Sequence, residues 1–175
     1  MRQWLIAVNV IGGVAVLGSY AHGLLTHPDT SGAVWGGVPA NLKPWYIVSM
    51  LTAAAGYFLF TYYVGFALAP ARVRIGARFG FGAFVSLYAL MLAASTCWMP
   101  LTFAMIAAPS AALWVAIRTV LFLVAIGSLG ILLAVASATP RAGDWSYGLA
   151  ILGATAFCIQ TVVLDAIVWP AFFPR

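Results

Sequence analysis

The stretch Ile151-Leu-Gly-Ala-Thr-Ala-Phe-Cys-Ile-Gln-Thr-Val-Val-Leu-Asp-Ala-Ile-Val-Trp169 is apolar over nearly the length that a membrane-crossing helix requires. It nevertheless contains a carboxylate, Asp165. An ionised group at this depth is costly in lipid unless it has a partner or faces water. Arg118 is the only other charge inside an apolar segment, so we expect the two to form an ion pair.

The composition of the whole chain supports a membrane protein. Hydrophobic residues make up 65% of the sequence and charged residues only 6%, too few to cover a soluble surface. The net charge of +5 is not arranged as a basic stripe with interleaved aromatic residues, so no nucleic-acid partner is expected. The basic residues are better interpreted as topology signals.

Five segments are long and apolar enough to cross a bilayer as helices. They span about 3–25, 44–69, 78–99, 110–138 and 145–169, with proline and glycine between them. Because the segments are continuously apolar rather than alternating, helices are favoured over a β-barrel. We therefore predict an all-α membrane protein, a single five-helix transmembrane bundle over 1–175, with a lid loop at 26–43.

The basic residues predict the orientation of this bundle. With five spans, Arg2, Arg72, Arg74, Arg78 and Arg141 share one side of the membrane, and Lys43 and Arg175 lie on the other. Because basic residues concentrate on the cytoplasmic side, the N-terminus is predicted inside and the C-terminus outside. The arginine bias fits a bacterial inner membrane.

Several polar and aromatic residues are predicted to share the outer half with Arg118 and Asp165. His22 lies near the outer end of the first span, Trp98 near the outer end of the third, and Trp35 in the long loop. This arrangement predicts an outer-half pocket under the loop. An ion pair that only orders the helices is the alternative, whereas one pair at one depth does not make an ion path.

Other chemistry finds little support in the sequence. His22 and His27 do not have a recognised metal-ligand spacing, so no metal site is predicted. There is no nucleophile triad, phosphate loop or carboxylate pair, and an enzyme is not favoured, although Asp165 with His22 could form an acid–base pair. Small residues such as Gly76 and Gly80 fit either packing within the bundle or a homodimer.

Three short motifs carry a resemblance to the TspO/translocator (tryptophan-rich sensory) family. The stretch Ser95-Thr-Cys-Trp98-Met-Pro100-Leu-Thr102-Phe103 resembles that family's N-x-x-W-x-P-x-F-F, with Ser95 in place of Asn and Thr102 in place of Phe. Lys43-Pro44-Trp45 is similar to its K-P-W motif, and Leu164-Asp165-Ala-Ile-Val-Trp169 to its L-N-x-x-I-W, with Asp165 in place of Asn. The paired prolines of the family's second helix are missing here.

The resemblance implies a five-helix bundle, often dimeric, with a pocket beneath the loop between the first two helices. It also implies ligands such as porphyrins, haem breakdown intermediates or sterol-like molecules, so porphyrin or haem is the cofactor that it suggests. The ligand-binding candidates from both lines of argument are Trp35, Trp45, Trp98, Asp165, Arg118, His22 and Ser95.

The function that these observations predict is binding, sensing or transport of a flat apolar ligand, either tetrapyrrole or lipid-like. Two alternatives remain open from the sequence. The chain could be an accessory subunit of a larger membrane complex, or an integral-membrane enzyme acting on a sterol- or isoprenoid-like substrate.

Overall fold

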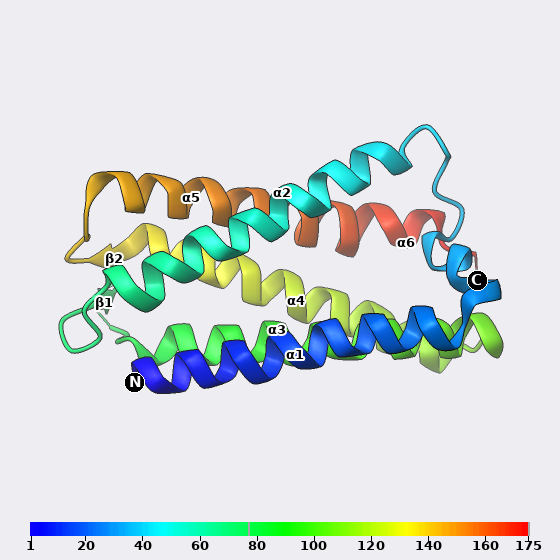
Figure 1. Ribbon diagram of the computed structural model, residues 1–175, viewed down its shortest axis with the longest axis horizontal. Coiled ribbons are helices and arrows are strands. Elements are labelled where there is room, and N and C mark those ends of the chain that lie inside the picture. Colours follow the sequence, from blue (N-terminus) through cyan, green and yellow to red (C-terminus); the bar gives the residue numbers. More distant parts are fainter. Residues whose placement is uncertain (77, 175) are drawn as a thin grey trace.

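The computed structural model describes residues 1–76 and 78–174, and within them it contains five helices long and apolar enough to span a membrane (Figure 1). The helical elements are α1 (Arg2–Thr26), η1 (Pro28–Trp35), α2 (Lys43–Tyr62), η2 (Tyr63–Ala67), α3 (Gly82–Ala107), α4 (Ala111–Ser137), α5 (Asp144–Cys158), η3 (Ile159–Val168) and α6 (Trp169–Phe172). The prediction of an all-α protein with five membrane-spanning helices is confirmed.

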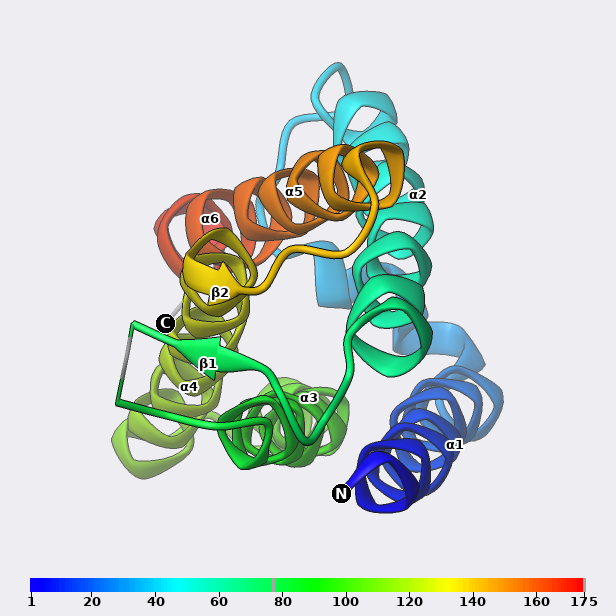
Figure 2. The ribbon, with the colours of Figure 1, turned by 90° about the vertical axis from the view of Figure 1, so that its left-hand side faces the viewer.

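The five long helices form a ring. α1 packs against α3, α3 against α4, α4 against α5 and η3, and α5 against α2 (Figure 2). The ring is weakest between α1 and α2, which touch only toward one end and diverge toward the other (Figure 1).

The arginine-rich end of the bundle lies opposite the end that carries η1 and the C-terminus. We call these the inner end and the outer end, following the orientation that the arginines predict. The inner end also holds a short antiparallel ladder of β1 (Arg74–Ile75) and β2 (Ala138–Thr139), which joins the two loops there. Arg175 lies outside the described residues.

Two segments differ from what the sequence led us to expect. α3 begins at Gly82 and continues through Pro100 to Ala107, whereas we expected helix over 78–99. In a membrane, ending a helix at the proline would leave several backbone groups unpaired, so a helix with an internal proline is favoured. The segment 26–43, expected as a loop, contains the 3₁₀ helix η1, which begins at Pro28.

The crossing of α2 and α5 depends on two glycines. A Cβ atom built on Gly56 would lie 2.4 Å from the Gly153 carbonyl oxygen, and one on Gly153 would lie 2.6 Å from that of Gly56. Any larger residue would therefore clash with backbone. Such close backbone approach replaces hydrophobic burial as the source of helix association in lipid.

Two clusters of buried side chains fill the bundle. The inner core consists mainly of aromatic and branched residues, including Leu5, Phe60, Tyr63, Val64, Leu68, Phe84, Tyr88, Met91, Ile131 and Val135. The outer core consists of Val38, Tyr46, Met105, Ile117, Leu121, Ala125, Ala166, Trp169 and Phe173. Several large aromatic residues that pack on the outer core, among them Trp35, Trp98 and Trp114, are only partly buried.

Candidate ligand site in the outer half

Asp165 lies in η3, where the fifth span widens into a π-helix. In an α-helix two residues five positions apart point about 140° away from each other. The wider π turn, in which backbone bonds join residues five apart, brings such side chains onto one face. Gln160 Nε2 accordingly donates a hydrogen bond of 2.8 Å to Asp165 Oδ1.

Arg118 does not pair with Asp165, and the expected ion pair is therefore wrong. Within the described part of the chain, no basic nitrogen lies within 4.0 Å of a carboxylate oxygen of Asp165. The Arg118 guanidinium instead donates a 2.9 Å bond to the carbonyl of Ala166 and lies 4.8 Å from the ring centre of Phe122.

A proline removes one possible backbone donor for the carbonyl that Arg118 binds. The α-helical donor for the Ala166 carbonyl would be the amide of residue 170, which is Pro170 and has no N–H. A carbonyl without a donor is costly in the apolar interior of a membrane protein. Arg118 donates to this carbonyl, and so the guanidinium stabilises the backbone of the fifth span rather than the carboxylate.

Two tyrosines lie near the carboxylate, and two tryptophan rings continue the aromatic group from one of them. The hydroxyls of Tyr20 and Tyr46 are close enough to interact with the charge of Asp165. The Tyr46 hydroxyl also donates a 3.4 Å hydrogen bond to the Leu164 carbonyl. The Trp98 ring centre lies 5.6 Å from that of Tyr20 and 5.7 Å from that of Trp169. The site therefore combines one carboxylate with aromatic faces from α1, α2, α3 and the fifth span.

Trp35 extends this aromatic group toward the outer surface. Its ring meets that of Tyr46 edge-on, with centres 6.2 Å apart, and Lys43 Nζ lies 5.8 Å from the centre of the Trp35 ring. The lysine is thus held on the outer side of Trp35 and makes no salt bridge among the described residues.

Two polar atoms of this site are buried without a hydrogen-bond partner, the indole nitrogen of Trp98 and the amide oxygen of Gln160. Gln160 as a whole is only 6% exposed. A buried donor or acceptor left unpaired costs about 1–3 kcal/mol. Asp165 and Trp98 themselves remain partly exposed.

The segment between α1 and α2 is hydrogen-bonded to the outer end of the fifth span. Trp169 Nε1 donates a 2.9 Å bond to the Val34 carbonyl, and the Gly37 amide donates a 2.7 Å bond to the Phe172 carbonyl. Gly36 allows the chain to turn here, because its φ is +57° and a side chain would meet the Phe173 backbone. The segment covers the outer end of the fifth span and is bonded to it.

The remaining candidates lie at the edge of the site or outside it. His22 is exposed on α1, and Trp45 is 72% exposed on the outside of α2. Ser95 is partly buried on α3, one turn before Trp98. His27 stacks on Phe103 rather than joining His22, and the described residues contain no group of three potential metal ligands.

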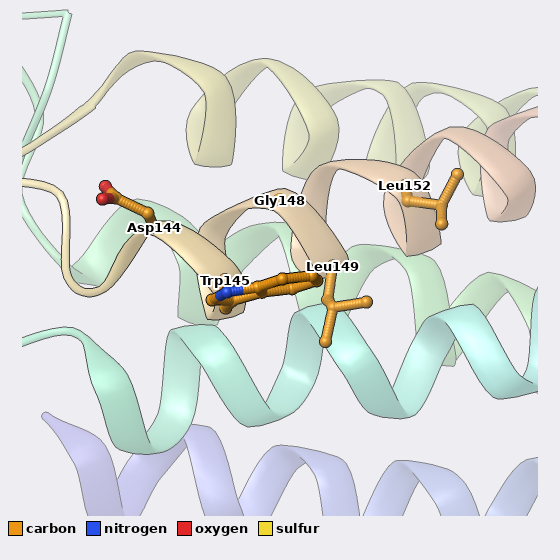
Figure 3. Close-up of a pocket in the computed structure, with 5 residues that line it drawn as sticks. All are labelled: Asp144, Trp145, Gly148, Leu149 and Leu152. Atoms are coloured by element: carbon orange, nitrogen blue, oxygen red, sulfur yellow. The ribbon is translucent and has the colours of Figure 1, made fainter.

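Two of the hollows on the surface of the bundle can be described, and neither includes Asp165 or Trp98. One, of about 380 Å³, runs along the first turns of α5 and is lined by Asp144, Trp145, Gly148, Leu149 and Leu152 (Figure 3). Trp145 is 86% exposed there, as expected for a membrane-interface tryptophan. The other, of about 330 Å³, lies at the outer end where α3 meets α4.

The residues that sequence reasoning missed are Tyr20, Tyr46, Gln160 and Trp169. Gln160 carried a usable signal, since it is a polar residue in the same apolar run as Asp165 and five positions before it. The tyrosines carried none, because tyrosines near span ends are equally typical of the membrane interface.

Comparison with known proteins adds no family assignment. No protein-family model matches the chain, and no curated protein or solved structure matches it significantly. The chain is an integral membrane protein with five membrane-spanning helices and tryptophan-rich aromatic clusters.

Proposed function

We propose that this protein is a membrane-embedded binding or sensory protein for a flat, largely apolar ligand. The ligand would be a tetrapyrrole or a sterol- or isoprenoid-like molecule, held in the outer half of the bundle. The observation that carries the proposal is the aromatic group near Asp165, in which Tyr20 and Trp98 are partly exposed, together with two buried polar atoms that lack partners. Rings give a flat ligand its contact area, and polar groups fix its orientation.

A divergent relationship to the TspO/translocator family is part of this proposal. Two of the three motifs that resemble the family are far apart in the sequence, yet they meet in the fold through the rings of Trp98 and Trp169. The third motif begins at Lys43, which lies against Trp35 at the outer side of the same aromatic group. A bacterial inner membrane, with the site in its outer leaflet, is likewise proposed from the arginine distribution.

The test is saturable binding to the purified full-length protein. Protoporphyrin and the fluorescent sterol dehydroergosterol both accept energy from tryptophan, so either would quench the protein's fluorescence on binding. We expect Trp98→Ala to weaken the affinity at least tenfold, or about 1.4 kcal/mol. Trp4→Ala is the matched control, because Trp4 is 67% exposed near the inner end and should leave the affinity unchanged.

Quenching that never saturates with either probe would contradict the proposal. Equal losses of affinity in Trp98→Ala and Trp4→Ala would also contradict it, because they would place the ligand on the lipid-facing surface.

A second candidate function, as an accessory subunit or a homodimer, is favoured by α1. Only Leu5 and Gly23 of this helix are buried, and a side chain added at Gly13 or Gly18 would meet nothing within 4 Å. A small residue at an open position of a helix allows close contact with another transmembrane helix. Cross-linking between cysteines placed at Gly13 and Gly18 in native membranes would detect such a neighbour.

A further inference from the structure

We propose that the group recognised at Asp165 is a protonated amine, and that the ligand is therefore a hydrophobic amine rather than an acid. This inference rests on the proposed function, since it concerns the same site. It follows from the charges, the acceptors and the aromatic rings that the fold places around the carboxylate.

The first step is that Asp165 has no cation of the protein beside it. Arg118 is bound to the Ala166 carbonyl, and Lys43 lies against Trp35. Among the described residues, neither makes a salt bridge, and the only hydrogen-bond donor to the carboxylate is the uncharged amide of Gln160. A buried carboxyl group without a cation tends to take up a proton, whereas a ligand cation would stabilise its ionised form, so the position suits a cationic group of the ligand.

The second step is that the neighbouring groups also suit a cation. Gln160 Oε1 is a buried acceptor without a donor, and an ammonium N–H directed at Asp165 would lie close to it. The rings of Tyr20, Trp98 and Trp169 form a contiguous aromatic wall, with centre-to-centre distances of 5.6 and 5.7 Å. Aromatic faces next to a carboxylate are the surroundings in which proteins bind ammonium groups.

The third step is that the same surroundings reject an anion. A ligand carboxylate placed here would face Asp165, and Trp98 Nε1, a buried donor without a partner, is uncharged. Like charges at contact distance in a medium of low polarity repel strongly. Of the flat apolar molecules that the site could hold, those with a basic nitrogen are favoured over those with carboxylates, such as protoporphyrin. Trp98 Nε1 would take a hydroxyl or ether oxygen of the same ligand.

The experiment compares two steroids that differ in one atom. The probe is a tritiated steroid with a dimethylamino group on its side chain, which is protonated at neutral pH. Its isostere carries C–H in place of the nitrogen. Saturation binding to the full-length protein in nanodiscs should show at least tenfold tighter binding of the amine, because only the amine can make a charge-assisted hydrogen bond and a cation–π contact.

Asp165→Asn should reduce the affinity for the amine about tenfold while changing that for the isostere by no more than about twofold. Asp144→Asn is the matched control, since it removes a carboxylate exposed at the inner end and should change neither affinity. If Asp165→Asn does not fold, Tyr20→Leu takes its place, because it removes one aromatic face and should lower the preference for the amine at least about threefold.

Equal binding of amine and isostere would overturn this inference and leave the proposed function intact. Tighter binding of protoporphyrin than of the amine would do the same. Failure of both steroids and of protoporphyrin to bind would remove the proposed function as well.

Discussion

The inner and outer halves of this bundle contain similar residues, but they differ in how fully the side chains are buried and how completely the polar atoms are hydrogen-bonded. In the inner core, Phe84 and Tyr88 are completely buried and the polar atoms have partners, such as the bond between the hydroxyls of Thr61 and Tyr88. In the outer half, Trp98 and Asp165 remain partly exposed, and Trp98 Nε1 has no partner. The inner half is arranged for stability, whereas the outer half keeps polar groups unmatched, as expected where a ligand completes the structure.

The largest expected effect tests the packing that makes the inner half tight. Gly153→Ala should destabilise the protein by about 3 kcal/mol or more, because the new Cβ would meet the Gly56 backbone, which can move only with the whole helix. Gly13→Ala is the matched control and should be neutral or slightly stabilising, since open space surrounds that position.

The measurement is the free energy of unfolding in mixed micelles, followed by circular dichroism. If Gly153→Ala proved as stable as Gly13→Ala, the close crossing of α2 and α5 would not exist in the membrane, and the contrast between the halves would weaken.

A comparison of single aromatic residues tests the contrast directly. Phe84→Ala in the inner core should cost about 3 kcal/mol, because a fully buried ring is lost and a cavity remains. Trp98→Ala in the outer half should cost about half as much, although it removes a larger ring, since Trp98 is partly exposed and its buried N–H is unpaired. The same unfolding assay would reveal equal costs, which would mean that the halves are packed alike.

Replacing Arg118 should change the free energy of unfolding by an intermediate amount, and a substitution at Pro170 provides the control. Arg118→Ala should cost about 1–3 kcal/mol, because the carbonyl of Ala166 loses its donor. In the background of Pro170→Ala, which restores a backbone N–H at position 170, the same substitution should cost clearly less. A double-mutant cycle measures this coupling. Additive effects would show that the proline is not the reason for the arginine's position.

The smallest expected effect separates stability from binding within the outer half. Trp98→Phe removes the unpaired indole N–H and keeps an aromatic ring, so we expect stability to stay within about 1 kcal/mol or to rise. Ligand affinity should fall in the same variant. A clear loss of stability without ligand would indicate that the N–H has a partner in the membrane.

The sequence was sufficient for the architecture, because helix length and continuous hydropathy are properties of local composition. It could also identify the depth of Asp165, since depth follows from counting residues along a span. It could not predict the neighbours of Asp165. Hydropathy carries no information on where a helix widens, and the π-helical η3 brings Asp165 and Gln160 onto one face.

The hydrogen bond from Arg118 to the Ala166 carbonyl could not be predicted from the sequence for a related reason. The two charges were the only ones in apolar segments, and an argument from charge alone pairs them. The competing demand came from the backbone, because Pro170 removes a donor. Likewise, a proline ends helices in water but not here, where α3 passes through Pro100.

The hydrogen bonds that join Val34 and Gly37 to the fifth span affect the route by which a ligand would enter the site. Because the segment between α1 and α2 is hydrogen-bonded to the fifth span at two points, it is poorly suited to opening the site toward water. The helices beside it carry exposed apolar side chains at the outer end, such as Leu25 and Trp45, and these would contact hydrocarbon instead of water. Loading would then proceed sideways from the bilayer, and a compound's partition coefficient, more than its aqueous concentration, would govern how much of the protein is occupied.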